Sequence, residues 1–187
     1  MLVKTRFVLY IAILIPQMMP PEPLLITNDV LWIRKFSLND AAFVLALVND
    51  PDWLKNIGDR DVHDLSQARK FIENGPLSTY QEKGFGLYVF GTQNTPAGMV
   101  GLLQRDYLCK PDLGYAILPE FRNKGLTYQA CALLLDFESR RMEIDSVYAM
   151  VSPDNHASVG VLKKLGFIEK QMIDNDGTKS RLFEVRL

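Results

Sequence analysis

The segment from Asp112 to Thr127 constrains the fold of this chain more than any other part of its sequence. Residues 112–118 are predicted to form a strand, which Pro119 ends because proline cannot donate to a ladder. A run Arg-Asn-Lys-Gly then leads into residues 127–140, where apolar residues have the spacing of one helix face. A glycine turn that opens a helix presents unpaired backbone N–H groups and the positive end of the helix dipole at one point. The segment therefore predicts a site where the main chain holds a phosphate or pyrophosphate.

The glycine turn supplies the candidate phosphate-binding residues. Gly125 lets the backbone approach a pyrophosphate with no side chain in between. The segment has neither the Walker pattern nor the dinucleotide glycine triplet, and on the residues alone a surface turn that merely starts a helix remains the alternative. We expect backbone donors, with added positive charge, from six consecutive residues: Arg122, Asn123, Lys124, Gly125, Leu126 and Thr127.

A second polar cluster lies in residues 152–167. Asp154 or Asn155 is expected to cap a short helix, and Gly166 to follow that helix in the left-handed conformation. One cap oxygen is enough for the helix, so Asn155 and Ser158 are predicted to place further polar groups near the strand ends. The same helix carries two cations that are expected on a solvated face, Lys163 and Lys164.

Composition narrows the class of protein. The chain has 187 residues, 48% of them hydrophobic and 23% charged, which is typical of one globular domain. Its net charge is −1 with basic residues scattered along it, so a nucleic-acid partner is not expected. The two histidines and two cysteines match no metal-ligand spacing, so no metal is expected. Cys109 and Cys131 are predicted to be reduced thiols of a cytoplasmic protein.

Residues 1–23 differ from the rest of the chain. Lys4 and Arg6 precede an apolar run at 7–15, and four prolines follow. The run is far shorter than the roughly 20 residues of a membrane span, and no small-residue cleavage site follows it, so neither a membrane segment nor an export signal is favoured. We expect an extra edge strand or an extension that packs on a neighbour or stays loose, with the domain covering 24–187.

The remaining patterns predict a mixed α/β domain. The element order is strand, two or three helices, three strands, helix, strand, helix and two strands, with 51–63 as a loop. Helices inserted into a mostly antiparallel sheet give a three-layer core. The predicted strands are 30–36, 86–92, 97–104, 112–118, 146–151, 167–173 and 181–187. The predicted helices run from Asn39 or Asp40 to before Pro51, from Asp64 or Ser66 to a break at Gly75-Pro76, over 77–82, over 127–140 and through the second cluster.

The two clusters together resemble the GNAT superfamily of acyl-CoA-dependent N-acetyltransferases. The resemblance is to the branch that contains the ribosomal-protein N-terminal amino acetyltransferases, and it extends from about Val30 to the C-terminus. It implies a central twisted sheet of about seven mostly antiparallel strands with helices on both faces. The residues that match the family pattern are Gly114, Tyr115, Leu118, Pro119, Arg122, Lys124 and Gly125, followed by Asn155, Ser158, Lys164, Gly166 and Phe167.

The resemblance also implies a reaction, in which acetyl-CoA is the co-substrate and a primary amine the acceptor. The pantetheine arm would run between strands 112–118 and 146–151, with the backbone of Ile117 and Leu118 pairing with its amides. The oxyanion is expected to meet the Leu118 N–H. Ser158 would protonate the departing sulfur and Asp112 would take the proton of the amine, although an aspartate at a strand start is often only a turn partner. A monomer or homodimer without membrane attachment is expected.

Two departures from the family pattern leave a second possibility open. Thr127 stands where the loop usually has glycine or alanine, and Leu162 stands where many relatives have a catalytic tyrosine. A CoA-binding or scaffold protein that has lost catalysis is therefore the alternative. Acceptor choice is expected in the loop 51–63, where Trp53 and Asp59 or Asp61 would meet a cationic amine, and in the first two helices and the terminal hairpin.

Overall fold

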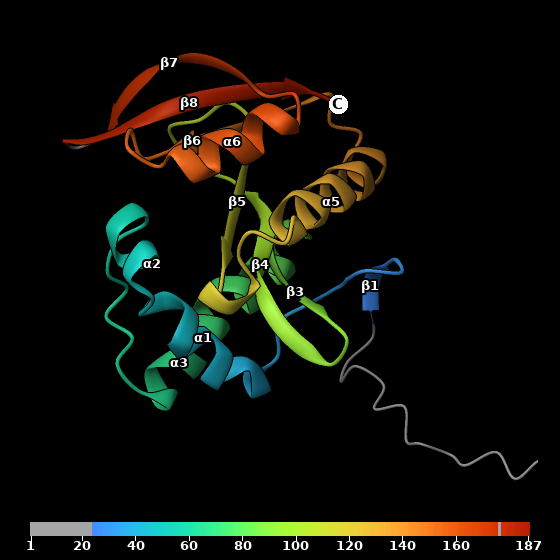
Figure 1. Ribbon diagram of the computed structural model, residues 1–187, viewed down its shortest axis with the longest axis vertical. Helices are drawn as coiled ribbons and strands as arrows, with labels where there is room; N and C mark the ends of the chain where they lie inside the picture. The colour runs from blue at the N-terminus through green and yellow to red at the C-terminus, as the bar shows by residue number, and fades with distance from the viewer. Residues whose placement is uncertain (1–23, 176) are drawn as a thin grey trace, which may run out of the picture.

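The computed structural model describes residues 24–175 and 177–187, which build one eight-stranded sheet (Figure 1). The strand order is β1-β2-β3-β4-β5-β6-β8-β7, and every neighbouring pair is antiparallel except β5 and β6. The predictions for residues 1–23 lie outside the described residues. The strands are β1 (Leu24–Thr27), β2 (Trp32–Arg34), β3 (Leu87–Thr92), β4 (Thr95–Leu103), β5 (Asp112–Ile117), β6 (Ser146–Val151), β7 (Ile168–Asn175) and β8 (Thr178–Arg186).

Helices cover both faces of this sheet. They are η1 (Leu38–Asp40), α1 (Ala41–Val48), α2 (Pro51–Asn56), α3 (Leu65–Ile72), η2 (Glu73–Leu77), α4 (Ser78–Lys83), η3 (Pro119–Phe121), α5 (Leu126–Met142) and α6 (His156–Lys164). Because side chains alternate along a strand, Tyr88 and Phe90 of β3 enter one core with α5 and α6, while Val89 enters a second core with α1 and α3. The predicted three-layer α/β fold is confirmed, with β1 as one strand more than expected.

Two helix predictions are wrong. The expected loop 51–63 begins with α2, since Asp50 accepts from the Asp52 N–H at 3.1 Å as a cap and Pro51 occupies a helix start. The expected break at Gly75-Pro76 is instead a π-helical turn that joins α3 to α4 without interruption. Pro76 is buried there, and the wider turn accommodates a residue without an N–H.

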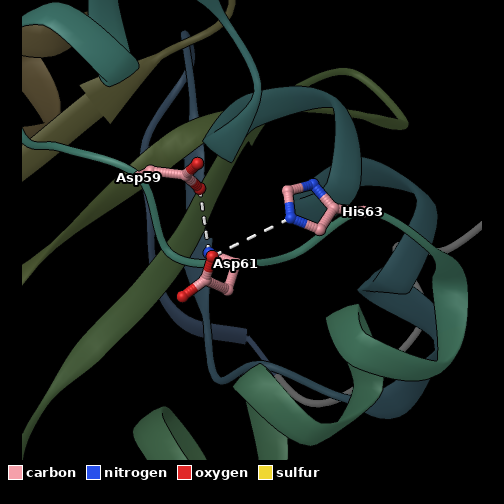
Figure 2. Close-up of side chains that lie close together, drawn as sticks. All are labelled: Asp59, Asp61 and His63. Carbon is pink, nitrogen blue, oxygen red and sulfur yellow. Dashed lines mark hydrogen bonds and ion pairs between the residues drawn. The ribbon is translucent and has the colours of Figure 1, made fainter.

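The segment after α2 brings three exposed side chains together (Figure 2). Asp59 Oδ1 accepts from the Asp61 N–H at 2.9 Å, and the imidazole of His63 lies 3.9 Å from the Asp61 carboxylate. Such a bond from an aspartate to the backbone two residues on is the usual geometry of an Asx turn. The turn therefore accounts for the proximity of the three residues.

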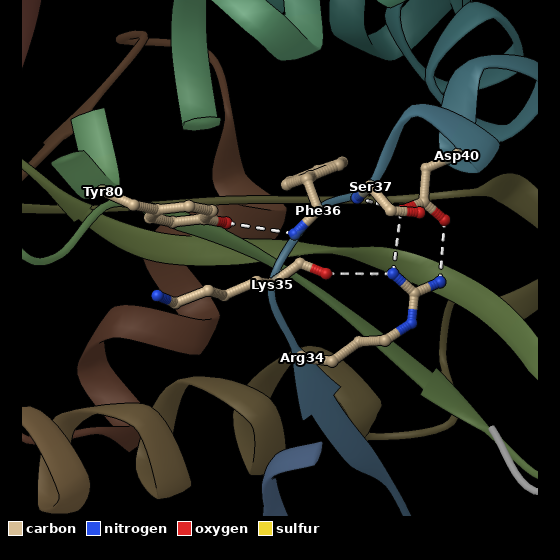
Figure 3. A network of polar contacts seen from close by, with 6 residues as sticks. All are labelled: Arg34, Lys35, Phe36, Ser37, Asp40 and Tyr80. Carbon is tan, nitrogen blue, oxygen red and sulfur yellow. Dashed lines mark hydrogen bonds and ion pairs between the residues drawn. The ribbon is translucent and has the colours of Figure 1, made fainter. Parts of the chain in front are cut away.

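A buried polar network joins β2 to the helices beside it (Figure 3). Arg34 is 3% exposed and donates two hydrogen bonds to Asp40, at 2.7 and 2.8 Å. Asp40 also accepts from the Ser37 N–H at 2.9 Å, so its carboxylate belongs to the start of η1. The sequence predicts that Asp40 is one of two possible caps of the first helix, but its side chain does not cap α1. The Tyr80 hydroxyl accepts from the Phe36 N–H at 3.2 Å and ties α4 to the same stretch.

No helix within the described part of the chain is both long enough and apolar enough to cross a membrane.

Candidate functional site

The site begins where β5 and β6 separate. These two strands run parallel and make a single residue pair, Asp112 with Tyr148, beside a bond of 2.9 Å from the Tyr148 N–H to the Pro111 carbonyl. Beyond that pair β5 bonds only to β4, and β6 only to β8. A cavity of about 1000 Å³ lies there, and residues 112–117 and 149–151 line it. The backbone of one side of each strand is therefore free to pair with a bound molecule.

The direction of the N–H groups at the end of β5 corrects one prediction. The Leu118 N–H donates to the Ala97 carbonyl at 2.9 Å, so it is not free to meet an oxyanion. Since successive residues of a strand direct their N–H groups to opposite sides, the Ile117 N–H faces the gap toward β6. Consistent with this direction, the Ile117 carbonyl accepts from the Arg122 side chain, which lies outside the β4 ladder.

The glycine turn has a left-handed glycine immediately before a helix. Gly125 has φ +73° and precedes α5, a helix of 17 residues that no side chain among the described residues caps. The first helical bond runs from the Gln129 N–H to the Gly125 carbonyl at 3.2 Å, which leaves the N–H groups of Leu126, Thr127 and Tyr128 for a ligand. All three residues line the cavity, as Asn123 and Gly125 do.

The two basic side chains of the turn do not point their charge at this helix end. Arg122 is held by Asp50 and Asp52 of the α2 start. The Lys124 ammonium lies 5.5 Å from the centre of the Phe121 ring and is not part of the cavity wall. Arg122 lines the cavity, but its charge is paired with the two aspartates, so the main chain supplies the unpaired donors of the turn.

The start of α6 forms another wall of the cavity. Asn155 is the cap that the sequence predicts as one of two, and its side chain accepts from the Ser158 N–H at 3.0 Å. Gly166 follows the helix with φ +86°, as predicted. Ser158 lines the cavity, and its carbonyl accepts from the Tyr115 hydroxyl at 3.1 Å. Leu162 is wholly buried in the core. The side chain at this position does not reach the surface of the cavity, so its being leucine and not tyrosine removes no group from that surface.

Asp112 lies at the closed end of the gap. Its carboxylate is buried and accepts from the Arg105 Nε, with its two oxygens at 3.0 and 3.1 Å. Burial raises the pKa of the Asp112 carboxyl, and Arg105 opposes that rise. A carboxylate with a raised pKa is a stronger base than an exposed one.

The cavity extends from the strands to α2 and to the terminal hairpin. Trp53 of α2 and Ile57, which follows this helix, line it on one side, and Ile173 and Ser180 of the hairpin also border it. The segment 51–63 and the terminal hairpin are two of the regions in which the sequence predicts acceptor choice. Of the expected acidic contacts in the loop, neither Asp59 nor Asp61 lines the cavity, although Arg60 between them does.

Two residues of the site, Tyr115 and Lys164, were given no role in it by the sequence analysis. Tyr115 faces α6, and burial raises the pKa of its hydroxyl, so it stays protonated as a donor. Strand alternation through Leu113 and Ile117 is the signal that predicts this direction. Lys164, expected on a solvated face, lines the cavity with its ammonium 4.3 Å from the centre of the Tyr128 ring. No sequence pattern indicates that contact.

Comparisons with known proteins agree with this geometry. The family model for an acetyltransferase (GNAT) domain matches residues 31–168. The chain is 27% identical over 162 residues to the uncharacterized N-acetyltransferase p20 of Bacillus licheniformis, covering 84% of this chain and 90% of that protein.

Solved structures share the fold. The Salmonella typhimurium acetyltransferase that modifies the N-terminal serine of ribosomal protein L7/L12 has a TM-score of 0.75 at 17% identity, covering 88% of this chain and 99% of that one. The microcin C7 self-immunity acetyltransferase MccE, solved with acetyl-CoA and AMP, has a TM-score of 0.74 at 19% identity, covering 86% and 94%.

Proposed function

The chain belongs to the GNAT acetyltransferase family, and from that premise we propose that it transfers the acetyl group of acetyl-CoA directly to a primary amine. The amine is a protein N-terminus or a small-molecule amine. The observation that carries the proposal is the uncapped start of α5, which opens into the same cavity as the gap between β5 and β6. The start of α5 can bind a diphosphate, and the gap between the two strands can bind an arm that carries amides.

Acetyl-CoA binds along these two features. Its pyrophosphate accepts from the N–H groups of Leu126, Thr127 and Tyr128, where the helix dipole favours negative charge by about 0.3–2 kcal/mol. Thr127 keeps its N–H and adds a hydroxyl, so its departure from the family pattern leaves the donor set intact. The pantetheine arm lies in the gap, where its amides pair with the backbone of β5 that precedes Ile117 and faces β6. Asn155 and Ser158 border the arm from α6.

The reaction is an attack of the neutral amine on the thioester carbonyl. A C–N bond forms and the carbonyl oxygen becomes an oxyanion, which accepts from the Ile117 N–H in place of the excluded Leu118 N–H. Collapse of this intermediate breaks the C–S bond. Alignment of the thioester with the amine supplies most of the rate, because an oriented intramolecular reaction needs little covalent assistance.

Two protons move during this transfer. The Asp112 carboxylate takes the proton of the attacking amine through a water molecule, and its raised pKa suits that role. The Ser158 hydroxyl protonates the departing thiolate and regains a proton from solvent, to which Asp112 releases its own. Tyr115 positions Ser158 through the hydrogen bond to its carbonyl. The products are an acetylated amide and coenzyme A with a free thiol.

The acceptor reaches the thioester from the side of α2 and the terminal hairpin. An α-helix and a hairpin at opposite borders of one cavity suit an extended peptide as well as a compact amine. The activity of the Salmonella relative on a protein N-terminus supports testing peptides first. A cytoplasmic location and a monomeric or homodimeric state stay predictions.

Thiol release in the presence of acetyl-CoA and a panel of amines tests the proposal. The panel contains peptides with free N-termini, and each peptide is matched by the same sequence with a blocked N-terminus. Release that depends on the free amine is the expected result. Tight coenzyme A binding without turnover on any amine would favour the scaffold alternative and would contradict the proposal.

A further inference from the structure

The carboxylates in the described wall of the cavity are all paired with arginines. They belong to Asp50, Asp52 and Asp112. Asp50 and Asp52 both bind Arg122, and Asp112 binds the Arg105 side chain at 3.0 Å. An acceptor with an extra ammonium group, such as a polyamine, would have to share one of these carboxylates with a guanidinium. Because two like charges at one carboxylate repel each other, the wall does not favour a cationic acceptor.

Two cations of the wall have no carboxylate at ion-pair distance within residues 24–175 and 177–187, namely Lys164 and Arg60. Lys164 lies beside the Tyr128 ring at the start of α5, so it belongs to the phosphate-binding end. Arg60 lies beyond the end of α2, and Figure 1 shows α2 on the opposite side of β5 from α5. Arg60 is therefore the unpaired cation at the acceptor end of the described cavity.

The two acidic neighbours of Arg60 in the sequence do not compensate its charge by contact. Asp59 Oδ1 accepts from the Asp61 N–H at 2.9 Å, and the Asp61 carboxylate lies 3.9 Å from the imidazole of His63 (Figure 2). Neither carboxylate lines the cavity, whereas Arg60 does. The turn thus keeps both acids out of the cavity wall and leaves the N–H donors of the guanidinium for a bound molecule.

The wall between Arg60 and the sheet is apolar. Trp53 of α2, Phe71 of α3 and Leu87 of β3 contribute to it. A hydrogen bond from a guanidinium to an anion is stronger beside such a surface than in bulk water. The planar fork of an arginine matches the two oxygens of a carboxylate, and one guanidinium balances one negative charge. A carboxylate is therefore the group that complements this end of the cavity.

We propose that the acceptor is an amine that carries a carboxylate, and that Arg60 selects it by binding that carboxylate. This inference rests on the proposed function, since it takes the other end of the cavity to hold acetyl-CoA. The carboxylate comes from an acidic side chain next to the N-terminus of a peptide or from a free amino acid. Arg60 determines specificity and does not touch the reacting atoms. The charge of the acceptor is thus the opposite of the one that Asp59 and Asp61 suggest in the sequence.

Thiol release from acetyl-CoA with matched acceptors tests this preference. Peptides with free N-termini differ only by aspartate or asparagine next to the N-terminus, free amino acids are matched by their carboxamides, and spermidine is the cationic acceptor. The carboxylate member of a pair should have a kcat/KM about tenfold higher. A preference confined to the peptide pairs would identify an acidic peptide, and one confined to the amino-acid pairs a free amino acid. Equal values within every pair, or a higher value for spermidine, would overturn the inference.

Arg60→Gln removes the proposed contact. Because Arg60 is exposed, the variant should fold like the wild type. The KM of the carboxylate acceptor should rise about tenfold with kcat unchanged, the result of losing a contact made equally in the ground state and the transition state. The amide acceptor and acetyl-CoA should keep their KM values. An equal loss for the carboxylate and amide acceptors would overturn the assignment.

Lys55→Gln is the matched control, because Lys55 is an exposed cation of α2 that does not line the cavity. It should leave the carboxylate preference unchanged, and a loss equal to that of Arg60→Gln would mean that only net charge matters. Added salt should weaken the preference of the wild type, since Arg60 is exposed.

The same assay separates this inference from the proposed function. Absence of turnover on every amine would contradict the proposed function and the inference together. Turnover that does not depend on the carboxylate would contradict the inference alone.

Discussion

The Tyr115 hydroxyl donates to the Ser158 carbonyl at 3.1 Å and so joins β5 to the first turn of α6 across the cavity. The bond fixes the distance between the strand that is proposed to orient the thioester and the helix that carries the proposed acid. Because burial raises the pKa of Tyr115, its hydroxyl stays protonated as the donor of this bond at neutral pH. The contact makes separate roles for the two hydroxyls testable.

Ser158→Ala should lower kcat by about a hundredfold, the usual contribution of one general acid or base. Coenzyme A affinity should change little, since the pyrophosphate donors are untouched. Steady-state kinetics on an accepted amine, with calorimetry for coenzyme A, checks both. Tyr115→Phe is the companion variant and should cost less, as it loses only a positioning bond. A fully active Ser158→Ala beside an inactive Tyr115→Phe would transfer the acid role to Tyr115.

Lys164→Gln should weaken acetyl-CoA binding several-fold at low salt, and less at high salt, because the Lys164 ammonium lies beside Tyr128 at the start of α5. Binding isotherms at two ionic strengths measure this difference. Lys163→Gln is the matched control, because Lys163 does not line the cavity. Equal losses in the two variants would mean that only net charge matters.

Asp40→Ala should lower the free energy of unfolding by about 3–5 kcal/mol, because it leaves Arg34 as a buried charge without its partner. Urea unfolding followed by circular dichroism measures the loss. Asp136→Ala breaks an exposed pair with Arg140 and should cost no more than about 1 kcal/mol. If both variants lost the same small amount, the network of Figure 3 would not stabilise the fold as described.

Glu184 should make the free energy of unfolding depend on pH in the acidic range. Hydrogen bonds from Lys110 and Lys170 lower the pKa of Glu184 from 4.5 to about 2. Between pH 4.5 and about 2 the carboxyl of Glu184 is protonated in the unfolded chain but not in the native chain. The contribution of Glu184 to the free energy of unfolding is therefore complete above pH 4.5 and disappears as the pH falls through about 2.

The measurement for Glu184 is unfolding in urea at several acidic pH values. The wild type should lose stability more steeply than Glu184→Gln between pH 4.5 and about 2, because the variant has no carboxyl to titrate. Parallel pH profiles for the two proteins would show that the two lysines do not bind Glu184 in this way.

The local parts of the site were predictable from the sequence. Gly125 before an apolar-faced helix and Asn155 before a second one define turn and cap through neighbours in the chain, and both are found as expected. The start of α2 also had a local signal, Asp50 followed by Pro51, but six residues are too few for a periodic pattern.

The remaining features depend on contacts between distant residues. The phase of β5, which directs the Ile117 N–H and not that of Leu118 into the gap, is set by a bond to Ala97 on another strand. Arg122 binds Asp50 from 72 residues away, and no spacing in the sequence indicates that pair. The π-helical turn at Pro76 forms because burial there outweighs local propensity.

Titration of the protein with coenzyme A in a calorimeter tests the central claim most directly, with Gly125→Val as the comparison. The site predicts saturable binding to the wild type and a large loss in the variant. Valine is strained at φ +73°, although no backbone atom crowds a Cβ there, so the rest of the fold should persist in its circular dichroism spectrum. Absence of binding to the wild type, or equal affinity in a folded Gly125→Val, would contradict the assignment of the turn before α5 as the diphosphate site.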